Sequence, residues 1–213
     1  MKSLVMFLAF IFSLNIYADT VSDKEKEVLI KFYHATNGSQ WKIKWDLSLS
    51  VSKWYGVNVE NGKIVGLNLP DNNLNGELPF ELGELSNLKI LSLGKNELHG
   101  NLPDSLYKMA SLKILLLNNN KLSGNLSTEI INFNALENLS LFDNNFEGEI
   151  PKGLERLHNL SEMNLSYNHF KGSVSEVLIS LDALNMTMFD ENGNPFLLEI
   201  NTEKETTIIT KNE

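Results

Sequence analysis

The sequence predicts an α/β solenoid, in which short coils of the chain stack on one another instead of folding into one globule. Three observations predict it. Asparagine recurs every 24 residues, glycine follows four residues after each of the first five of these asparagines, and a short run of alternating apolar residues precedes each asparagine. A coil of this length cannot bury its own apolar face, so a strict period implies that neighbouring coils cover one another.

Residues 1–18 have the composition of a secretory signal peptide. Lys2 precedes an apolar run from Leu4 to Leu14, and Ala18 is a small residue suited to cleavage. The run is shorter than the about 20 apolar residues that span a bilayer, which disfavours a membrane anchor. We therefore expect an exported chain, secreted or periplasmic, with no membrane span after cleavage.

Residues 19–63 are expected to form an N-terminal cap over the open apolar end of the first coil. An amphipathic helix is predicted over residues 22–37, because Ser22 and Glu25 have the spacing of a capping box. Glycine at position 38 gives the stop signal.

Three tryptophans follow this helix, at Trp41, Trp45 and Trp54. Aromatic clusters can bind sugars, but so much ring area next to the first repeat favours a role in the core of the cap. Asn61 and Gly62 then lie between two apolar runs, which predicts a hairpin with a type I′ turn.

Residues 64–196 are predicted to contain five full repeats and a sixth, degenerate one. The first, fourth and sixth residues of each repeat are apolar, as in a short strand. The ninth is an asparagine, whose amide can satisfy backbone groups of its own and adjacent coils at a bend. This structural asparagine ladder consists of Asn72, Asn96, Asn120, Asn144, Asn168 and Asn192.

Two phrases carry a family resemblance. Residues 73–79 read Asn-Leu-Asn-Gly-Glu-Leu-Pro and residues 145–151 read Asn-Phe-Glu-Gly-Glu-Ile-Pro. Both resemble the L-x-x-L-x-L-x-x-N-x-L-x-G-x-I-P signature of plant-type, 24-residue leucine-rich repeats. The resemblance implies a right-handed superhelix with a concave parallel β-sheet and a short second strand. The cap is similar to that of bacterial and oomycete members and lacks the paired cysteines of plant receptors, which favours a bacterial exported protein.

The repeat pattern ends near residue 196, and residues 197–213 are expected to form a C-terminal cap and tail. An apolar stretch at residues 196–200 is predicted to close the last coil, with Met186 and Met188 beneath it. The polar residues beyond 201 are typical of a frayed end.

Composition excludes several classes of function. The net charge of −9 and the single arginine, Arg156, disfavour nucleic acid, which requires a basic stripe. There is no cysteine, and the four histidines share neither a repeat column nor a ligand spacing, so we expect no metal and no cofactor. No nucleophile, base or carboxylate pair recurs at catalytic spacing, so we expect no enzyme.

The residues between the inward-facing strand positions should cover the concave sheet. Ile90, Ile114, Leu116, Phe142 and Tyr167 fall in consecutive coils and are predicted to form one apolar patch with a polar edge. A β surface also tolerates such residues singly without a function, but their clustering favours an interaction site. The candidate partner-binding residues are Ile90, Ser92, Lys95, Ile114, Leu116, Asn118, Asn138, Ser140, Phe142, Asp143, Glu162, Asn164 and Tyr167.

We therefore expect a non-enzymatic recognition module that binds a protein through the concave face. The alternative is a carbohydrate binder in which Phe142 and Tyr167 are stacking platforms between asparagine-rich columns. The sequence leaves open the identity of the partner and the oligomeric state.

Overall fold

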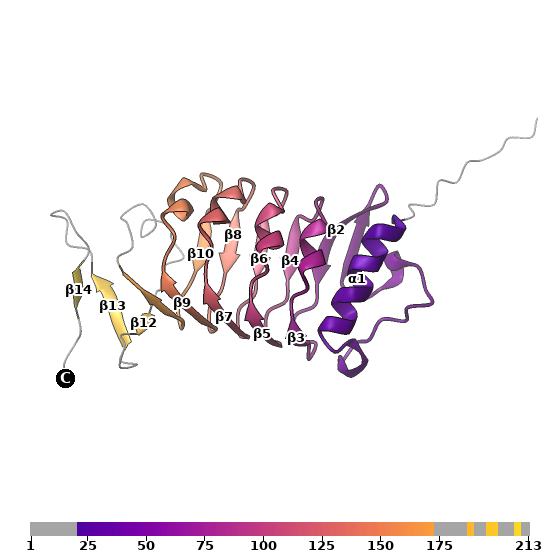
Figure 1. Cartoon of the computed structure of the whole chain (residues 1–213), viewed down its shortest axis with the longest axis horizontal. Coiled ribbons are helices and arrows are strands. Elements are labelled where there is room, and N and C mark those ends of the chain that lie inside the picture. The colour runs from indigo at the N-terminus through magenta and orange to yellow at the C-terminus, as the bar shows by residue number, and fades with distance from the viewer. Residues whose placement is uncertain (1–20, 173–186, 190–194, 200–206, 210–213) are drawn as a thin grey trace, which may run out of the picture.

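The chain winds into an elongated stack of coils behind an N-terminal cap (Figure 1). The computed structural model describes residues 21–172, 187–189, 195–199 and 207–209. The expected signal peptide, Met186 and Asn192 of the asparagine ladder lie outside these ranges.

The cap begins with helix α1 (Asp23–Ala35), whose first turn is fixed by the predicted capping box. The Ser22 hydroxyl accepts a hydrogen bond from the Glu25 backbone N–H at 3.3 Å and donates one to the Glu25 carboxylate at 2.9 Å. The helix stops before residue 37, and the short 3₁₀ helix η1 (Gly38–Gln40) follows it. The predicted helix is therefore confirmed, with slightly tighter bounds.

The three tryptophans form the core of the cap, which confirms the structural interpretation of this cluster. All of them are buried, and each indole N–H donates a hydrogen bond to a backbone carbonyl of the cap. The Trp45 and Trp54 rings stack with their centroids 4.8 Å apart. The second 3₁₀ helix of the cap, η2 (Val51–Lys53), ends beside this stack.

A hairpin of strands β1 (Val57–Glu60) and β2 (Lys63–Asn68) joins the cap to the stack. The turn residues Asn61 and Gly62 have φ values of 50° and 70°, as a type I′ turn requires. Because β1 pairs antiparallel with β2, the cap covers the first edge of the concave sheet with a strand of its own.

The concave sheet has the strand order β1-β2-β4-β6-β8-β10, and its strands from β2 onward are parallel. Its last four strands are β4 (Ile90–Ser92), β6 (Ile114–Leu116), β8 (Asn138–Ser140) and β10 (Glu162–Asn164). Each residue pairs with the one 24 positions later, as Leu91 does with Leu115. The 24-residue period of the sequence is therefore the register of the sheet.

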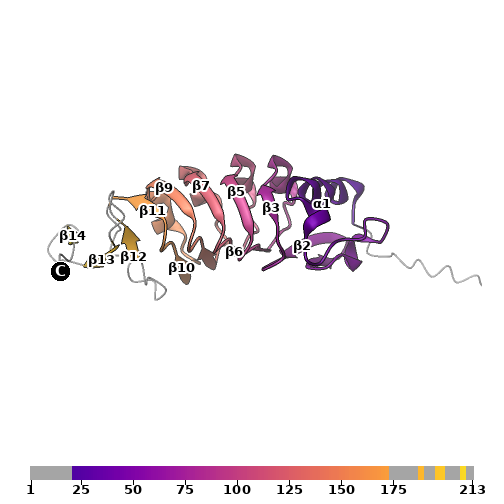
Figure 2. The same cartoon turned by 90° about the horizontal axis from the view of Figure 1, so that it is seen from below.

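A second parallel sheet runs along the stack (Figure 2). Its strands are β3 (Asn75–Glu77), β5 (Glu97–Asn101), β7 (Lys121–Asn125), β9 (Asn145–Glu149) and β11 (His169–Lys171). Short 3₁₀ helices then return the chain to the next concave strand: η3 (Phe80–Glu84), η4 (Asp104–Lys108), η5 (Thr128–Asn132) and η6 (Lys152–Arg156). The columns of leucine between these layers form one continuous buried core.

The asparagine ladder ties successive coils together, and Asn96 shows how. Its side-chain Oδ1 accepts hydrogen bonds from the backbone N–H groups of Asn72 and Leu74, at 2.9 and 3.0 Å. Its Nδ2 donates to the carbonyls of Leu69 and Leu93, at 2.9 and 2.8 Å. One amide thus satisfies bend N–H and carbonyl groups of the preceding coil and a bend carbonyl of its own coil.

Beyond the fifth repeat the described backbone departs from the pattern. Strand β12 (Thr187–Phe189) belongs to the degenerate sixth repeat, yet it pairs antiparallel with β13 (Pro195–Glu199), which pairs antiparallel with β14 (Thr207–Ile209). These strands form a separate three-stranded sheet, so β12 does not extend the concave parallel sheet.

Candidate partner-binding site

The concave strands place the predicted binding residues in two rows across the sheet. One row holds the first residue of each strand, and the other holds the third. In order along the stack, these rows are Ile90, Ile114, Asn138 and Glu162, and Ser92, Leu116, Ser140 and Asn164. The middle residue of each strand is buried in the core, so both rows face the opposite side of the sheet.

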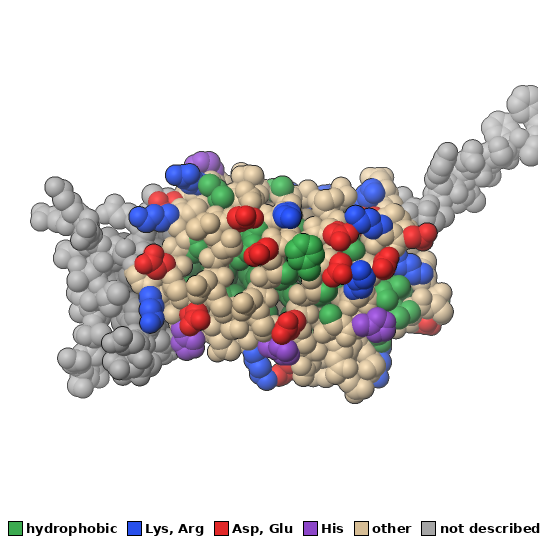
Figure 3. Space-filling view, in the orientation of Figure 1, with side chains coloured by type: hydrophobic (Ala, Val, Ile, Leu, Met, Phe, Trp, Pro, Cys, Tyr) green, Lys and Arg blue, Asp and Glu red, His purple; other side chains and the backbone are tan. Residues whose placement is uncertain are grey.

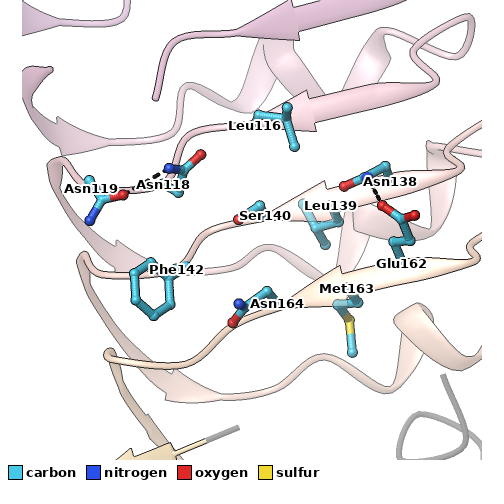
Figure 4. A pocket seen from close by; sticks show the side chains of 10 residues that line it. All are labelled: Leu116, Asn118, Asn119, Asn138, Leu139, Ser140, Phe142, Glu162, Met163 and Asn164. Carbon is cyan, nitrogen blue, oxygen red and sulfur yellow. Dashed lines mark hydrogen bonds between the residues drawn. The ribbon is translucent and has the colours of Figure 1, made fainter. Parts of the chain in front are cut away.

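An open groove of about 480 Å³ crosses strands β6, β8 and β10 on this side (Figure 4). Its lining is mainly apolar or amide in character, and Glu162 is its one charged side chain. The residues that line it are Leu116, Asn118, Asn119, Asn138, Leu139, Ser140, Phe142, Glu162, Met163 and Asn164.

Hydrogen bonds between neighbouring coils hold the polar side chains of the groove. Asn138 donates from Nδ2 to the Glu162 carboxylate in the next coil. At the other end of the strands, Asn118 donates to Asn119 at 2.8 Å, and Asn119 donates to Asp143 at 2.6 Å. These side chains are therefore oriented before any partner arrives.

Two aromatic side chains stand at the end of the groove where the strands turn. The rings of Phe142 and Tyr167 meet edge to face, with centroids 5.1 Å apart and an interplanar angle of 68°. Phe142 lines the groove, whereas Tyr167 lies just outside it and is 46% exposed. Tyr167 has a φ of 55°, the left-handed conformation that the same position adopts in the four preceding coils, at Asp71, Lys95, Asn119 and Asp143.

The periodic sequence of the stack is shared with a known family of repeats. A family model described as Leucine Rich Repeat matches residues 87–109 and 135–157, which lie within two of the coils described above. The fold is a leucine-rich repeat solenoid. The right-handed coil architecture with a concave parallel sheet and a short second strand, expected from the resemblance, is thereby established.

Leucine-rich repeat proteins of plants are similar to this chain in sequence and fold. The leucine-rich repeat receptor protein kinase EMS1 of Arabidopsis thaliana is 34% identical over 95 residues, which are 44% of this chain and 8% of the kinase. The ectodomain of the Arabidopsis thaliana receptor kinase SOBIR1 superposes with a TM-score of 0.67 at 22% identity, covering 78% of this chain and 92% of that chain. A chain of the Arabidopsis thaliana BIR3–SERK2 complex has a TM-score of 0.60 at 29% identity, and the match covers 71% of this chain and 85% of that chain.

The leucine-rich repeat geometry gathers some of the predicted site residues and separates others. Seven of them line the groove: Leu116, Asn118, Asn138, Ser140, Phe142, Glu162 and Asn164. Ile90, Ser92 and Ile114 lie on the sheet closer to the cap, while Lys95, Asp143 and Tyr167 lie at the turns that follow the strands. On the sheet Ile90 lies beside Ile114, whereas Leu116 and Phe142 line the groove and the Tyr167 ring meets that of Phe142.

Three lining residues were not among the predicted site residues: Asn119, Leu139 and Met163. Leu139 and Met163 were assigned to the interior because they occupy the inward column, and both are indeed buried. Asn119 is half-buried, and its side chain accepts a hydrogen bond from Asn118 and donates one to Asp143. The 24-residue spacing of Asn119 and Asp143 was the available signal for this contact.

Several exposed ionisable groups with a shifted pKa lie away from the groove, at the junction between the cap and the first coils. A hydrogen bond from Lys42, 2.5 Å long, lowers the pKa of Asp71. A hydrogen bond of 3.0 Å to Glu81 raises the pKa of Lys31 and lowers that of Glu81. These are surface ion pairs that attach the cap.

The described ranges contain no group of three or more His, Asp or Glu side chains that could hold a metal ion. Within the same ranges, no helix has both the length and the apolar character needed to cross a bilayer.

Proposed function

We propose that this protein is a non-enzymatic recognition module that binds a protein partner at the groove of the concave leucine-rich repeat sheet. The observation that carries the proposal is the groove itself, in which Leu116 and Phe142 are half-buried beside pre-oriented amide groups. Protein interfaces combine such an apolar centre with a polar rim. A similar chain, at 29% identity, was solved within the BIR3–SERK2 complex, which supports binding of proteins rather than of small molecules.

The proposed function includes export. The signal-like residues 1–18 and the resemblance of the cysteine-free cap to bacterial members support a secreted or periplasmic product. Mass spectrometry of the exported protein should find a new N-terminus close to Ala18. An exported form that retains Met1 would contradict this part of the proposal.

The binding experiment compares two classes of ligand in parallel. The purified mature chain is used as bait for surface proteins, and the same preparation is applied to a glycan array. We expect a protein that is captured by the parent and lost with Phe142→Ala. Selective binding to glycans, lost with the same substitution, would instead support the carbohydrate alternative, in which the Phe142–Tyr167 pair stacks on a sugar.

A further inference from the structure

The strands of the concave sheet and the residues just before and after them carry five acidic side chains in the described part of the chain, and three of them are paired with lysine. Glu60 lies 2.7 Å from the Nζ of Lys89, and Glu137 lies 2.6 Å from that of Lys113. Asp71 pairs with Lys42 at the cap, as described above. Each of these three acids is therefore neutralised by a nearby lysine.

The other two acids, Asp143 and Glu162, flank the groove and have amide partners instead. Asp143 accepts a hydrogen bond from Asn119, and Glu162 accepts one from Asn138. Each donor stands 24 residues earlier, in the position where a lysine would neutralise the acid. Among the described residues, neither acid is within 4.0 Å of a basic nitrogen. Each acid keeps its negative charge and further lone pairs for another donor.

The surroundings of Glu162 fit the two parts of a long basic side chain. Leu116 and Phe142 present apolar surface in the same groove, where an aliphatic stem can lie. Figure 4 shows the Glu162 carboxylate beside Asn138 at the end of the groove opposite Phe142. A charged head placed there would form a charge-assisted hydrogen bond with the oxygen that Asn138 does not fully occupy. The net charge of −9 favours approach of a cationic partner.

We infer that the groove selects a segment of the partner protein that carries an arginine or lysine beside an apolar residue. The apolar residue packs on Phe142 and Leu116, and the basic head binds Glu162. Asp143, in the turn that follows β8, adds electrostatic attraction for the basic side chain. This inference rests on the proposed function, because it assigns chemistry to the same surface.

A displayed library of random 12-residue peptides tests the inference without knowledge of the natural partner. We expect the parent chain to select peptides rich in arginine or lysine next to aliphatic or aromatic residues. Their affinity should fall about tenfold with Glu162→Gln and should weaken as salt is added. Asp143→Asn should act mainly on the association rate. Glu149→Gln, on the exposed face of β9, is the matched control and should bind like the parent.

The outcomes separate the inference from the function on which it rests. One outcome would overturn the basic-segment inference and leave the proposed function standing. In it, the selected peptides lack basic residues, no longer bind Phe142→Ala, and bind Glu162→Gln as well as they bind the parent. If no selected peptide depends on Phe142, the concave groove is not the binding surface and both fail. Circular dichroism and thermal melts of each variant confirm that folding is unchanged.

Discussion

The Tyr107 hydroxyl accepts a hydrogen bond of 3.2 Å from the backbone N–H of Ser127 in the next coil. Ser127 occupies the repeat position that is proline in three other coils, at Pro79, Pro103 and Pro151. Its φ of −68° matches theirs, but serine has an N–H that proline lacks. Tyr107 supplies the acceptor that this exceptional N–H needs.

This pair gives a testable double-mutant cycle. Tyr107→Phe should lower the free energy of unfolding by about 1–3 kcal/mol, because the Ser127 N–H loses its partner. Ser127→Pro should be tolerated, since the native φ already suits proline. In the Ser127→Pro background, Tyr107→Phe should cost distinctly less, because the donor is gone. Urea denaturation of the four proteins measures the coupling, and purely additive effects would contradict the assigned role.

Tyr107 also predicts a dependence of stability on alkaline pH. Burial raises the pKa of its phenol above the usual 10.0, so the folded chain holds this proton more tightly than the unfolded chain. The contribution of the Tyr107 phenol to the free energy of unfolding is fully present below pH 10.0 and is lost as pH rises through the folded-state pKa. Melts between about pH 9 and about pH 11 should show a steeper loss for the parent than for Tyr107→Phe. Parallel curves would refute the prediction.

Two adjacent asparagines should differ in their importance for folding. Asn120 accepts from the Leu98 backbone N–H and donates to the Leu93 carbonyl, each at 3.0 Å, so Asn120→Ala should cost about 1–3 kcal/mol. The Asn119 side chain bonds only to other side chains, so Asn119→Ala should cost less, about 1 kcal/mol, because alanine disfavours the left-handed φ of 55° at this position. Thermal melts of the two variants measure the difference in stability. Equal shifts in melting temperature would mean that the ladder asparagine is not the structural one.

The attachment of the cap depends on Gly76. Its φ is 142°, and a Cβ built on it would lie 1.9 Å from the Ala35 carbonyl oxygen. Gly76→Ala should therefore detach the cap from β3, with at least about 1–3 kcal/mol lost through the backbone conformation alone. All three tryptophans lie in the cap, so their fluorescence reports on this change separately from the repeats. Gly153→Ala, which meets no atom closer than 3.2 Å, is the control and should leave the fluorescence transition in place.

For binding, Phe142→Ala should weaken the affinity for the identified protein partner by about 2 kcal/mol or more, as expected for an aromatic residue in the centre of an interface. Ile90→Ala, on β4 outside the groove lining, should change affinity by less than about 1 kcal/mol. Calorimetric titration of both variants measures the difference. Parent-like binding by Phe142→Ala together with Leu116→Ala would place the interface elsewhere.

Strictly periodic features were predictable from the sequence, because each copy confirms the others. The asparagine at the ninth position of each repeat indicated both the register of the concave sheet and the bends between coils. Local signals were equally informative: the capping box at Ser22 and the turn at Gly62 each depend on a few neighbouring residues. The rows of the candidate site followed directly from the period.

Contacts made by exceptions to the period were not predictable in the same way. The Tyr107–Ser127 bond joins residues at different repeat positions, so no column contains both. The groove depends on the relative sizes of the outward-facing side chains in neighbouring coils, which a burial pattern does not give. The sixth repeat keeps Asn192 but has Phe196 in the glycine column, and the nearby strand β13 pairs antiparallel with β12.

The uniform register between coils has a consequence for how such a chain can change over generations. Duplicating 72 bases of coding sequence between β2 and β4 would insert one complete coil, because every parallel pairing of the concave sheet joins residues 24 apart. The groove would move away from the cap by one strand spacing, about 4.8 Å, while all of its own contacts stayed the same. The distance of the groove from the cap and the chemistry of the groove can therefore change independently in this molecule. The distance depends on the number of coils, and the chemistry depends on the side chains of three of them.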